Sequence, residues 1–275
     1  MNTRTTAARA VCILTILFVS GCGAGNGHGD AAPALTGDPG ASPATADISL
    51  LFMGNSHTSV NDLPSMVAAM VRAGRPARTV AAVVAPGWMF LEDRVGDVPT
   101  LNLLRSQNWS FVILQAQKYS SSGQFTYSTV EAEELVRLSR RQNAVPVLFP
   151  EWPRKNIPET QRIYDLHVSI ARKEPACVAP IPQAWDLAMA RHPDLILHDA
   201  DGNHSAPAGA FLTALVLYAT ITGLSPADLP TLSQPSVDAP IQLQLRGIAT
   251  ETVQTIAPRL WCPGDRVAAE GVSLR

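Results

Sequence analysis

Short apolar runs that alternate with amphipathic stretches constrain the fold of this chain more than any other feature. Runs of this kind occupy residues 48–53, 79–84, 111–114, 145–149 and 177–181. Because they are short and apolar at almost every position, they are typical of strands buried on both faces. Stretches with helical spacing of apolar residues lie between and after them, beginning at residue 61 and at 131–141, 159–173 and 208–222. This alternation predicts one α/β domain with a parallel sheet.

The composition excludes some classes of protein. Apolar residues make up 46% of the 275 positions, whereas disordered chains are poor in apolar residues and rich in net charge. The formal net charge is −2, so no basic excess is available to neutralise a nucleic-acid backbone. The chain also has no motif for cradling phosphate, binding a metal or holding a nucleotide. We therefore expect no nucleic-acid partner, no metal and no cofactor.

The N-terminus carries a separate signal. Arg4 and Arg9 precede an apolar run at residues 11–19, which is too short to span a bilayer, since that needs about 20 residues. A basic start, a short apolar run and small residues are typical of a secretory signal. The run ends in Val-Ser-Gly-Cys at residues 19–22, which resembles the lipobox of bacterial lipoproteins. The alternative is an ordinary signal peptide in which Cys22 is incidental.

These features predict three segments. Residues 1–21 would be a lipoprotein signal peptide, residues 22–46 the lipidated Cys22 and a flexible tether, and residues 47–275 the folded domain. We expect an exported protein of the bacterial cell envelope, held at the membrane only by its lipid anchor. After processing, Cys177 and Cys262 remain. They could form a disulfide in an oxidising compartment or stay as two buried thiols.

Candidate catalytic residues follow the predicted strands, where sites form in open α/β sheets. Ser56 follows the first strand, and Asp201 and His204 lie in a turn near the end of the pattern. A hydroxyl nucleophile needs a base within hydrogen-bond reach, and the base needs an orienting carboxylate. Because Asp201 lies three residues before His204, one loop can carry both. Taken alone, Ser56 could instead be a helix cap.

An ester hydrolase also needs fixed donors for the developing oxyanion. The backbone N–H groups of Ser56 and Gly87 are candidates, because glycine lets the backbone approach a substrate closely. A glutamine side chain after the third strand could supply a third donor. Gln115 and Gln117 both follow that strand.

At these positions the sequence resembles the SGNH (GDSL-like) hydrolase superfamily, over about residues 48–226. The matching blocks are Gly54-Asn55-Ser56, Gly87 and Asp201-Gly202-Asn203-His204. The resemblance implies a flavodoxin-like three-layer α/β/α domain with a five-stranded parallel sheet. It implies Ser56 as nucleophile, His204 as base and Asp201 as its orienter. Two departures stand out: Ser205 replaces a usual Pro, and Gln115-Ala116-Gln117 replaces a usual Gly-x-Asn. From that match the resemblance implies Gln117 as the third oxyanion donor, with Gln115 as the alternative.

The resemblance implies a serine esterase, and by family analogy its substrate would be a small ester or an O-acyl group on a carbohydrate. The alternative is a catalytically weak or inactive glycan-binding lipoprotein on the same fold, which the two departures motivate.

Several neighbouring side chains have open roles. His57 adjoins Ser56 and could compete as the base. Glu151 and Arg154 follow the fourth strand and could touch a substrate. Three tryptophans could either stack on a sugar or pack in the core, namely Trp88, Trp152 and Trp185.

Overall fold

A six-stranded sheet forms the centre of the fold in the computed structural model, which describes residues 35–37, 42–233 and 236–264. The strand order is β1-β3-β2-β4-β5-β6. The strands are β1 (Leu35–Gly37), β2 (Ile48–Met53), β3 (Val80–Val84), β4 (Phe111–Leu114), β5 (Val145–Leu148) and β6 (Cys177–Val178). The predicted signal peptide and Cys22 lie outside the described residues.

The five strands from β2 to β6 are mutually parallel, as predicted from the apolar runs. Strand β2 lies between β3 and β4, and it is buried along almost its whole length. Its central position explains why the sequence of residues 48–53 is nearly continuously apolar rather than alternating. The carboxyl end of β2 therefore opens at the middle of the sheet, where the chain continues into Gly54 and Ser56.

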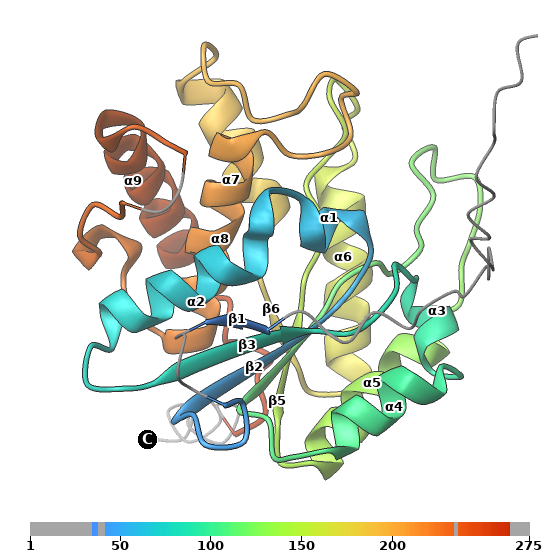
Figure 1. Cartoon of the computed structure of the whole chain (residues 1–275). Helices are drawn as coiled ribbons and strands as arrows, with labels where there is room; N and C mark the ends of the chain where they lie inside the picture. Colours follow the sequence, from blue (N-terminus) through green and yellow to red (C-terminus); the bar gives the residue numbers. More distant parts are fainter. Residues whose placement is uncertain (1–34, 38–41, 234–235, 265–275) are drawn as a thin grey trace, which may run out of the picture. The chain divides into compact units, whose positions relative to one another are not determined.

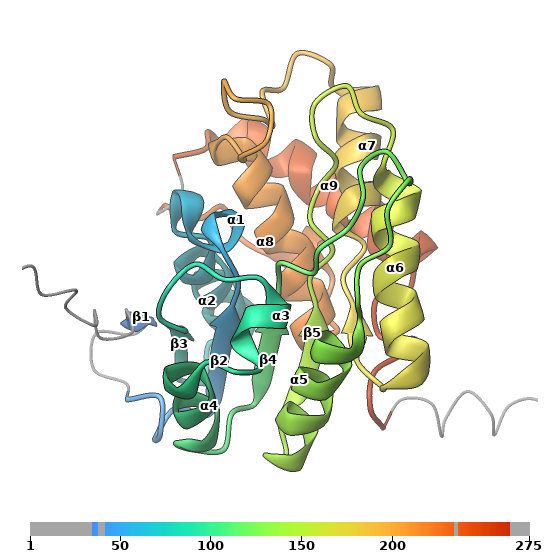
Figure 2. The ribbon, with the colours of Figure 1, turned by 90° about the vertical axis from the view of Figure 1, so that its right-hand side faces the viewer.

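Helices cover both faces of the sheet (Figure 1 and, from the side, Figure 2). One layer packs on the core that contains Leu50, Phe52 and Ile113, and the other packs on the core that contains Leu51, Val112 and Leu114. The first layer holds α2 (Leu63–Gly74), α7 (Ile181–Arg191), α8 (Pro207–Thr222) and α9 (Ala239–Thr255). The second holds α3 (Leu91–Arg94), α4 (Val98–Arg105), α5 (Val130–Arg141) and α6 (Thr160–Lys173). These two layers and the sheet give the predicted three-layer α/β/α architecture.

Helix α8 is the central helix of its layer. Every residue from Gly209 to Ile221 is buried, which is expected of a helix that is apolar on all sides. It begins with Pro207 and ends at Gly223, whose φ of 70° continues the chain in the left-handed conformation that favours glycine. Since α8 follows the turn that carries Asp201 and His204, its burial fixes where that turn lies.

Some elements differ from the sequence prediction. Residues 22–46 are predicted to be a tether, yet Leu35–Gly37 pair antiparallel with β3 as the edge strand β1. The run at 177–181 is a strand for only two residues, because α7 begins at Ile181. Helices α7 and α9 are absent from the prediction. None of the helices in the described part of the chain has the length and apolar character needed to cross a bilayer.

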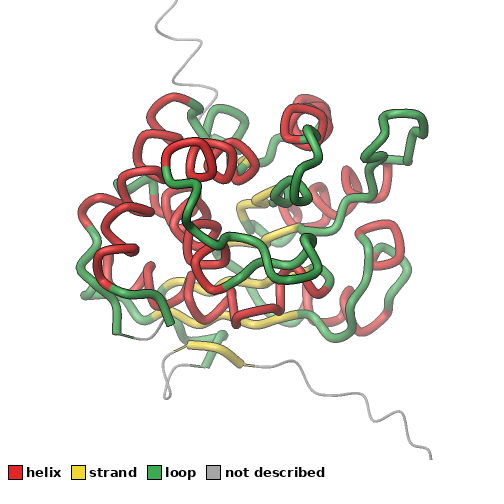
Figure 3. Tube along the Cα trace, turned by 90° about the horizontal axis from the view of Figure 1, so that it is seen from above, coloured by secondary structure: helices red, strands yellow, loops and turns green. Residues whose placement is uncertain are grey.

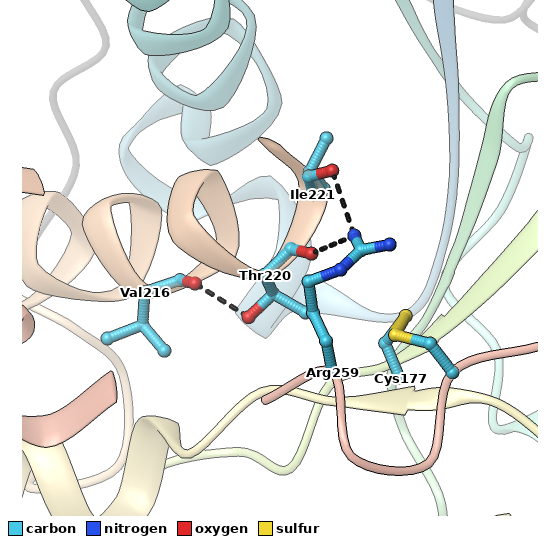
Figure 4. The surroundings of a disulfide bond; sticks show 6 residues. Cys177, Val216, Thr220, Ile221 and Arg259 are labelled. Atoms are coloured by element: carbon cyan, nitrogen blue, oxygen red, sulfur yellow. Dashed lines mark hydrogen bonds between the residues drawn. A yellow bond between two sulfur atoms is a disulfide. The ribbon is translucent and has the colours of Figure 1, made fainter. Parts of the chain in front are cut away.

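A disulfide joins Cys177 in β6 to Cys262, beyond the end of α9. The same C-terminal segment contacts β6 through its backbone, since Val178 donates a hydrogen bond to the Pro258 carbonyl over 3.0 Å. Arg259 donates to the carbonyls of Thr220 and Ile221 at the end of α8 (Figure 4). Of the two alternatives left open by the sequence, the structure has the disulfide, and it closes the β6 edge of the sheet.

Candidate active site

The turn after β2 places Ser56 at the start of the short helix α1 (Ser56–Ser59). In the view from above, several loops (green) lie in front of the strands (yellow) (Figure 3). Asn55 caps α1, because its side-chain oxygen accepts the His57 N–H over 3.0 Å. Gly54 precedes it with no room for a side chain, since a Cβ there would collide with Thr58 Oγ1 and Gln115 Oε1. The Gly-Asn-Ser sequence is thus what allows the tight turn that exposes Ser56.

Ser56, His204 and Asp201 form a continuous chain of hydrogen bonds. The distance from Ser56 Oγ to His204 Nε2 is 2.8 Å, and that from His204 Nδ1 to Asp201 Oδ2 is 2.5 Å. Because a carboxylate only accepts, His204 Nδ1 carries the hydrogen, and Nε2 is left to accept the Ser56 hydroxyl proton. The structure therefore brings together the three residues singled out as a possible triad.

The carboxylate of Asp201 is stabilised in its charged form. It accepts the side-chain hydrogen bond from His204, and Oδ1 also accepts the backbone N–H groups of Asn203 and His204. These bonds, the one from the His204 side chain first, hold the pKa of Asp201 well below its usual value. Asp201 is therefore ionised throughout the neutral range and keeps His204 in one tautomer.

Hydrogen bonds at its base hold the loop that carries Asp201 and His204 in position. His198 and Ser205 form an antiparallel bridge at its base. His198 Nε2 lies 2.8 Å from the Pro153 carbonyl, and Trp152 Nε1 donates to the Asn203 carbonyl over 2.8 Å. A tight turn at Gly202, with φ of 70°, completes the loop. These contacts give His204 a defined position although Asp201 itself is about half exposed.

His57 packs beside His204 and does not bind the Ser56 hydroxyl. The two imidazole rings are stacked with their centroids 5.0 Å apart, and the tilted Trp152 ring lies at the same distance from His57. Burial is the main cause that lowers the pKa of His57 to about 4, and the neighbouring His204 adds to the effect. His57 is thus neutral at pH 7 and packs as a ring.

Two backbone donors in the loops after β2 and β3 have no hydrogen-bond partner in the part of the chain that the structure describes. Among the described residues, neither the Ser56 N–H nor the Gly87 N–H has a hydrogen bond. Gly87 lies in the loop after β3 with φ of 71°, a conformation that favours glycine. Both groups remain available to an external acceptor.

The glutamine prediction requires correction. Gln117 Nε2 donates to the carbonyls of Lys118 and Ser128 over 2.9 and 2.8 Å, so both of its amide hydrogens are used within the protein. Gln115 Nε2 donates to Glu151, and its oxygen accepts from Asn55 N–H and Thr58 Oγ1. Gln117 therefore has no free amide hydrogen, whereas one of the two Gln115 amide hydrogens has no partner among the described residues. The other contacts of Gln115 support the turn that carries Ser56.

The other candidate side chains differ in whether they are buried or exposed. Trp152 and Trp185 are buried and stack on one another 4.8 Å apart, so they belong to the core. Trp88, next to Gly87, is 70% exposed and can touch a substrate. Arg154 is exposed, whereas Glu151 is largely buried, 3.8 Å from His57 Nδ1.

Sequence reasoning missed Arg94, which is fully buried and hydrogen-bonded to the backbone on either side of the site. Because Arg94 lies in a short, charged helix, its sequence context is typical of an exposed residue. Only the carbonyls around it in the folded chain indicate its role. Within the described residues, no three His, Cys, Asp or Glu side chains are grouped so that they could hold a metal ion.

Comparisons with known proteins agree on the fold. A chain from Slackia heliotrinireducens, provisionally assigned to the SGNH hydrolases, superposes with a TM-score of 0.51 at 23% identity, over 62% of this chain and 97% of that one. A DUF4886 family protein from Bacteroides uniformis superposes with a TM-score of 0.60 at 14% identity, over 75% of this chain and 95% of that one. No family model matches the sequence, and no curated protein matches it. The chain thus has the fold of the SGNH hydrolases.

Proposed function

We propose that this chain, which has the SGNH hydrolase fold, is a serine hydrolase of carboxylic esters. The observation that carries the proposal is the hydrogen-bond chain from Ser56 Oγ through His204 to Asp201, with distances of 2.8 and 2.5 Å. A hydroxyl in hydrogen-bond contact with an oriented imidazole is the arrangement that nucleophilic acyl transfer requires.

In the acylation step, Ser56 Oγ attacks the ester carbonyl carbon while its proton passes to His204 Nε2. The carbonyl π electrons move to the oxygen and form the tetrahedral oxyanion. The oxyanion electrons then re-form the carbonyl while the bond between the acyl carbon and the alcohol oxygen breaks, and that oxygen takes the proton from His204. The products of this step are the free alcohol and an acyl group on Ser56. Asp201 stabilises the imidazolium that exists between the two proton transfers.

In the deacylation step, water repeats the role of Ser56. His204 Nε2 accepts a proton from the water as its oxygen attacks the acyl carbon. Collapse of the second oxyanion releases the carboxylic acid, and the proton returns from His204 to Ser56 Oγ. The N–H groups of Ser56 and Gly87 are the donors we assign to both oxyanions, because they are unpaired among the described residues. A fixed donor of this kind contributes roughly 10²–10³ in kcat.

We further propose that the protein is lipid-anchored through Cys22 in the bacterial cell envelope. Support comes from the lipobox-like residues 19–22 and from the Cys177–Cys262 disulfide, since disulfides are typical of exported proteins.

For the substrate we propose an acyl ester on a carbohydrate. The exposed ring of Trp88 beside Gly87 favours this class, because aromatic faces provide stacking surface.

The test is hydrolysis of p-nitrophenyl acetate by residues 23–275, which lack the proposed signal peptide and Cys22. We expect turnover by the wild type and a loss of about 10³-fold or more in Ser56→Ala. Ser59→Ala is a matched control, since this serine lies on the same short helix. Equal rates in wild type and Ser56→Ala would exclude Ser56 as the nucleophile.

One observation favours a second candidate, the glycan-binding protein without catalysis. Both amide hydrogens of Gln117 are engaged within the protein, so the glutamine expected to bind the oxyanion is not available for it. This candidate predicts binding of an acetylated cell-wall glycan by the wild type, with no release of acetate over hours. Release of acetate that depends on Ser56 decides for the ester hydrolase.

A further inference from the structure

Arg94 is a buried cation at the junction of the two loops that supply the backbone donors. It ends the short helix α3, and its side chain has no exposed surface. One guanidinium nitrogen, Nη2, donates to the carbonyls of Gly54 and Gly87 over 2.7 and 2.8 Å. The other, Nη1, donates to the Pro86 carbonyl over 3.2 Å and to Thr100 Oγ1 over 2.9 Å. One side chain therefore joins the loop after β2 to the loop after β3.

The Pro86 carbonyl matters because it shares a peptide plane with the Gly87 N–H. In a trans peptide the carbonyl and the N–H point in opposite directions, and the described residues contain no cis peptide bond. By holding the Pro86 oxygen, Arg94 therefore turns the Gly87 N–H away from itself. The orientation of this donor depends on the guanidinium.

The Gly54 carbonyl has a similar role on the other loop. Its peptide plane includes the Asn55 N–H, which donates to Gln115 Oε1 over 2.9 Å. The plane is thus held at both ends, by Arg94 and by Gln115, directly before Ser56. A displaced Gly54 carbonyl would rotate the start of α1 and with it the Ser56 N–H.

The guanidinium of Arg94 is buried without a carboxylate of the described chain hydrogen-bonded to it. Among the described residues no carboxylate hydrogen-bonds to the guanidinium, and Nε has no partner. Asp97 lies nearby, but it caps α4 by accepting the Thr100 N–H. Burial lowers the pKa of Arg94 to about 10, so it is still charged at pH 7. A buried cation without an ionic partner is costly for folding, and an apolar side chain would be cheaper.

We propose that Arg94 is a positioning residue for the oxyanion hole, where it fixes the Gly87 and Ser56 N–H groups relative to each other. This inference rests on the proposed ester hydrolase function. Arg94 acts through the two loops and does not touch the substrate. Its loss would leave ester binding nearly intact and weaken stabilisation of the transition state.

The experiment measures kcat and KM for p-nitrophenyl acetate in Arg94→Ala and Arg94→Lys, each at a temperature where circular dichroism reports a folded protein. We expect kcat to fall about 10²-fold or more in Arg94→Ala, with KM changed less than about 3-fold. Arg94→Lys keeps the charge but cannot hold several carbonyls with a planar fork, so its kcat should fall by a smaller factor. Guanidinium chloride at a low, non-denaturing concentration should restore part of the kcat of Arg94→Ala, and sodium chloride should not.

Arg259→Ala is the matched control, because Arg259 also binds two backbone carbonyls but lies by the disulfide (Figure 4). It should lose thermal stability and keep wild-type kcat. The proposal is overturned if folded Arg94 variants keep wild-type kcat, or if their loss only follows the unfolded fraction. If Arg94→Ala does not fold, Arg94→Lys decides by the same criterion. A wild type that neither hydrolyses the ester nor reacts at Ser56 would contradict the proposed function instead.

Discussion

Glu151 is a largely buried carboxyl group beside His57, the ring that stacks on the proposed base His204. It accepts a hydrogen bond from Gln115 over 3.0 Å and lies 3.8 Å from His57 Nδ1. Burial is the main cause that raises its pKa to about 7, with a further rise from Glu159 and an opposing effect from Gln115 and Arg154. Tyr119 also lies within the electrostatic reach of this carboxyl group. Glu151 is thus partly protonated at neutral pH and titrates beside the site.

This titration predicts a pH-dependent effect of Glu151→Gln on stability. Between its ordinary value of 4.5 and about 7 the folded state binds more protons than the unfolded state, so the wild-type free energy of unfolding falls as pH rises. Glutamine removes this loss. The variant should therefore match the wild type near pH 4.5 and exceed it at pH 8, by up to about 3 kcal/mol. Urea unfolding at the two pH values measures the difference, and Glu131→Gln, at a partly exposed position, is the control. A pH-independent difference would contradict the account.

At the residue scale, the sequence was sufficient to predict a site residue where one short segment carries the whole motif. Asp201 and His204 lie in one loop, and Ser56 lies in a recognisable turn, so their approach could be predicted. The roles of Gln117 and Arg94 could not, because they depend on which carbonyls lie nearby. The Ser128 carbonyl that receives the Gln117 amide is 11 residues away in the chain. The carbonyl of Gly54 is 40 residues from Arg94.

At the scale of elements, helices α8 and α9 contain glycines with opposite surroundings. A side chain at Gly209 in α8 would collide with the Leu197 carbonyl and the Trp185 ring, whereas Gly247 in α9 has nothing within 4 Å. The Leu197 carbonyl also accepts the Ala206 N–H over 2.8 Å, so it cannot retreat freely. The close approach at Gly209 thus places α8 against the base of the loop that carries His204.

Alanine substitutions should separate these two glycines. Gly247→Ala should raise the free energy of unfolding by about 0.5–1 kcal/mol, because alanine favours a helix and meets no obstacle. Gly209→Ala should lower it by roughly 1–3 kcal/mol through overpacking, and should also reduce activity by moving the His204 loop. Thermal unfolding and ester hydrolysis measure the two effects. Stabilisation by Gly209→Ala would show that the contact is not as tight as described.

Elements were predictable when their sequence pattern was strong. Strands β2 to β5 are continuous apolar runs, and α8 is apolar along its length with Pro207 and Gly223 at its ends, so both kinds of element were expected. Helix α9 has a weak pattern, since only five of its 17 residues are buried. Strand β1 is three residues long and depends on pairing with β3, which no local pattern reveals.

At the scale of the whole molecule, the disulfide connects segments that are distant in the chain. Cys177 and Cys262 are separated by 85 residues, and their bond ties the end of the described chain to the edge of the sheet. Closing so long a loop restricts the unfolded chain and stabilises the fold by about 2–5 kcal/mol. The sequence left this pairing open because spacing alone does not show which cysteines meet.

Removing the disulfide should therefore lower the thermal midpoint. For a domain of this size, a loss of 2–5 kcal/mol corresponds to a decrease of about 5–15 °C. The measurement compares Tm of Cys177→Ser with that of the wild type, with and without a reductant. Reductant should lower Tm in the wild type and have no effect on Cys177→Ser. Equal Tm values for wild type and variant, or free thiols in the unreduced wild type, would contradict the disulfide.

The most direct test of the central claim is covalent capture of the nucleophile. A fluorophosphonate reacts with an activated serine by losing fluoride and forming a phosphonyl ester, which mass spectrometry locates on a peptide. The account predicts one adduct per wild-type chain, on the peptide that contains Ser56, none in Ser56→Ala and much slower labelling in His204→Ala. A wild type that stays unlabelled, or an adduct of equal yield in Ser56→Ala, would contradict it.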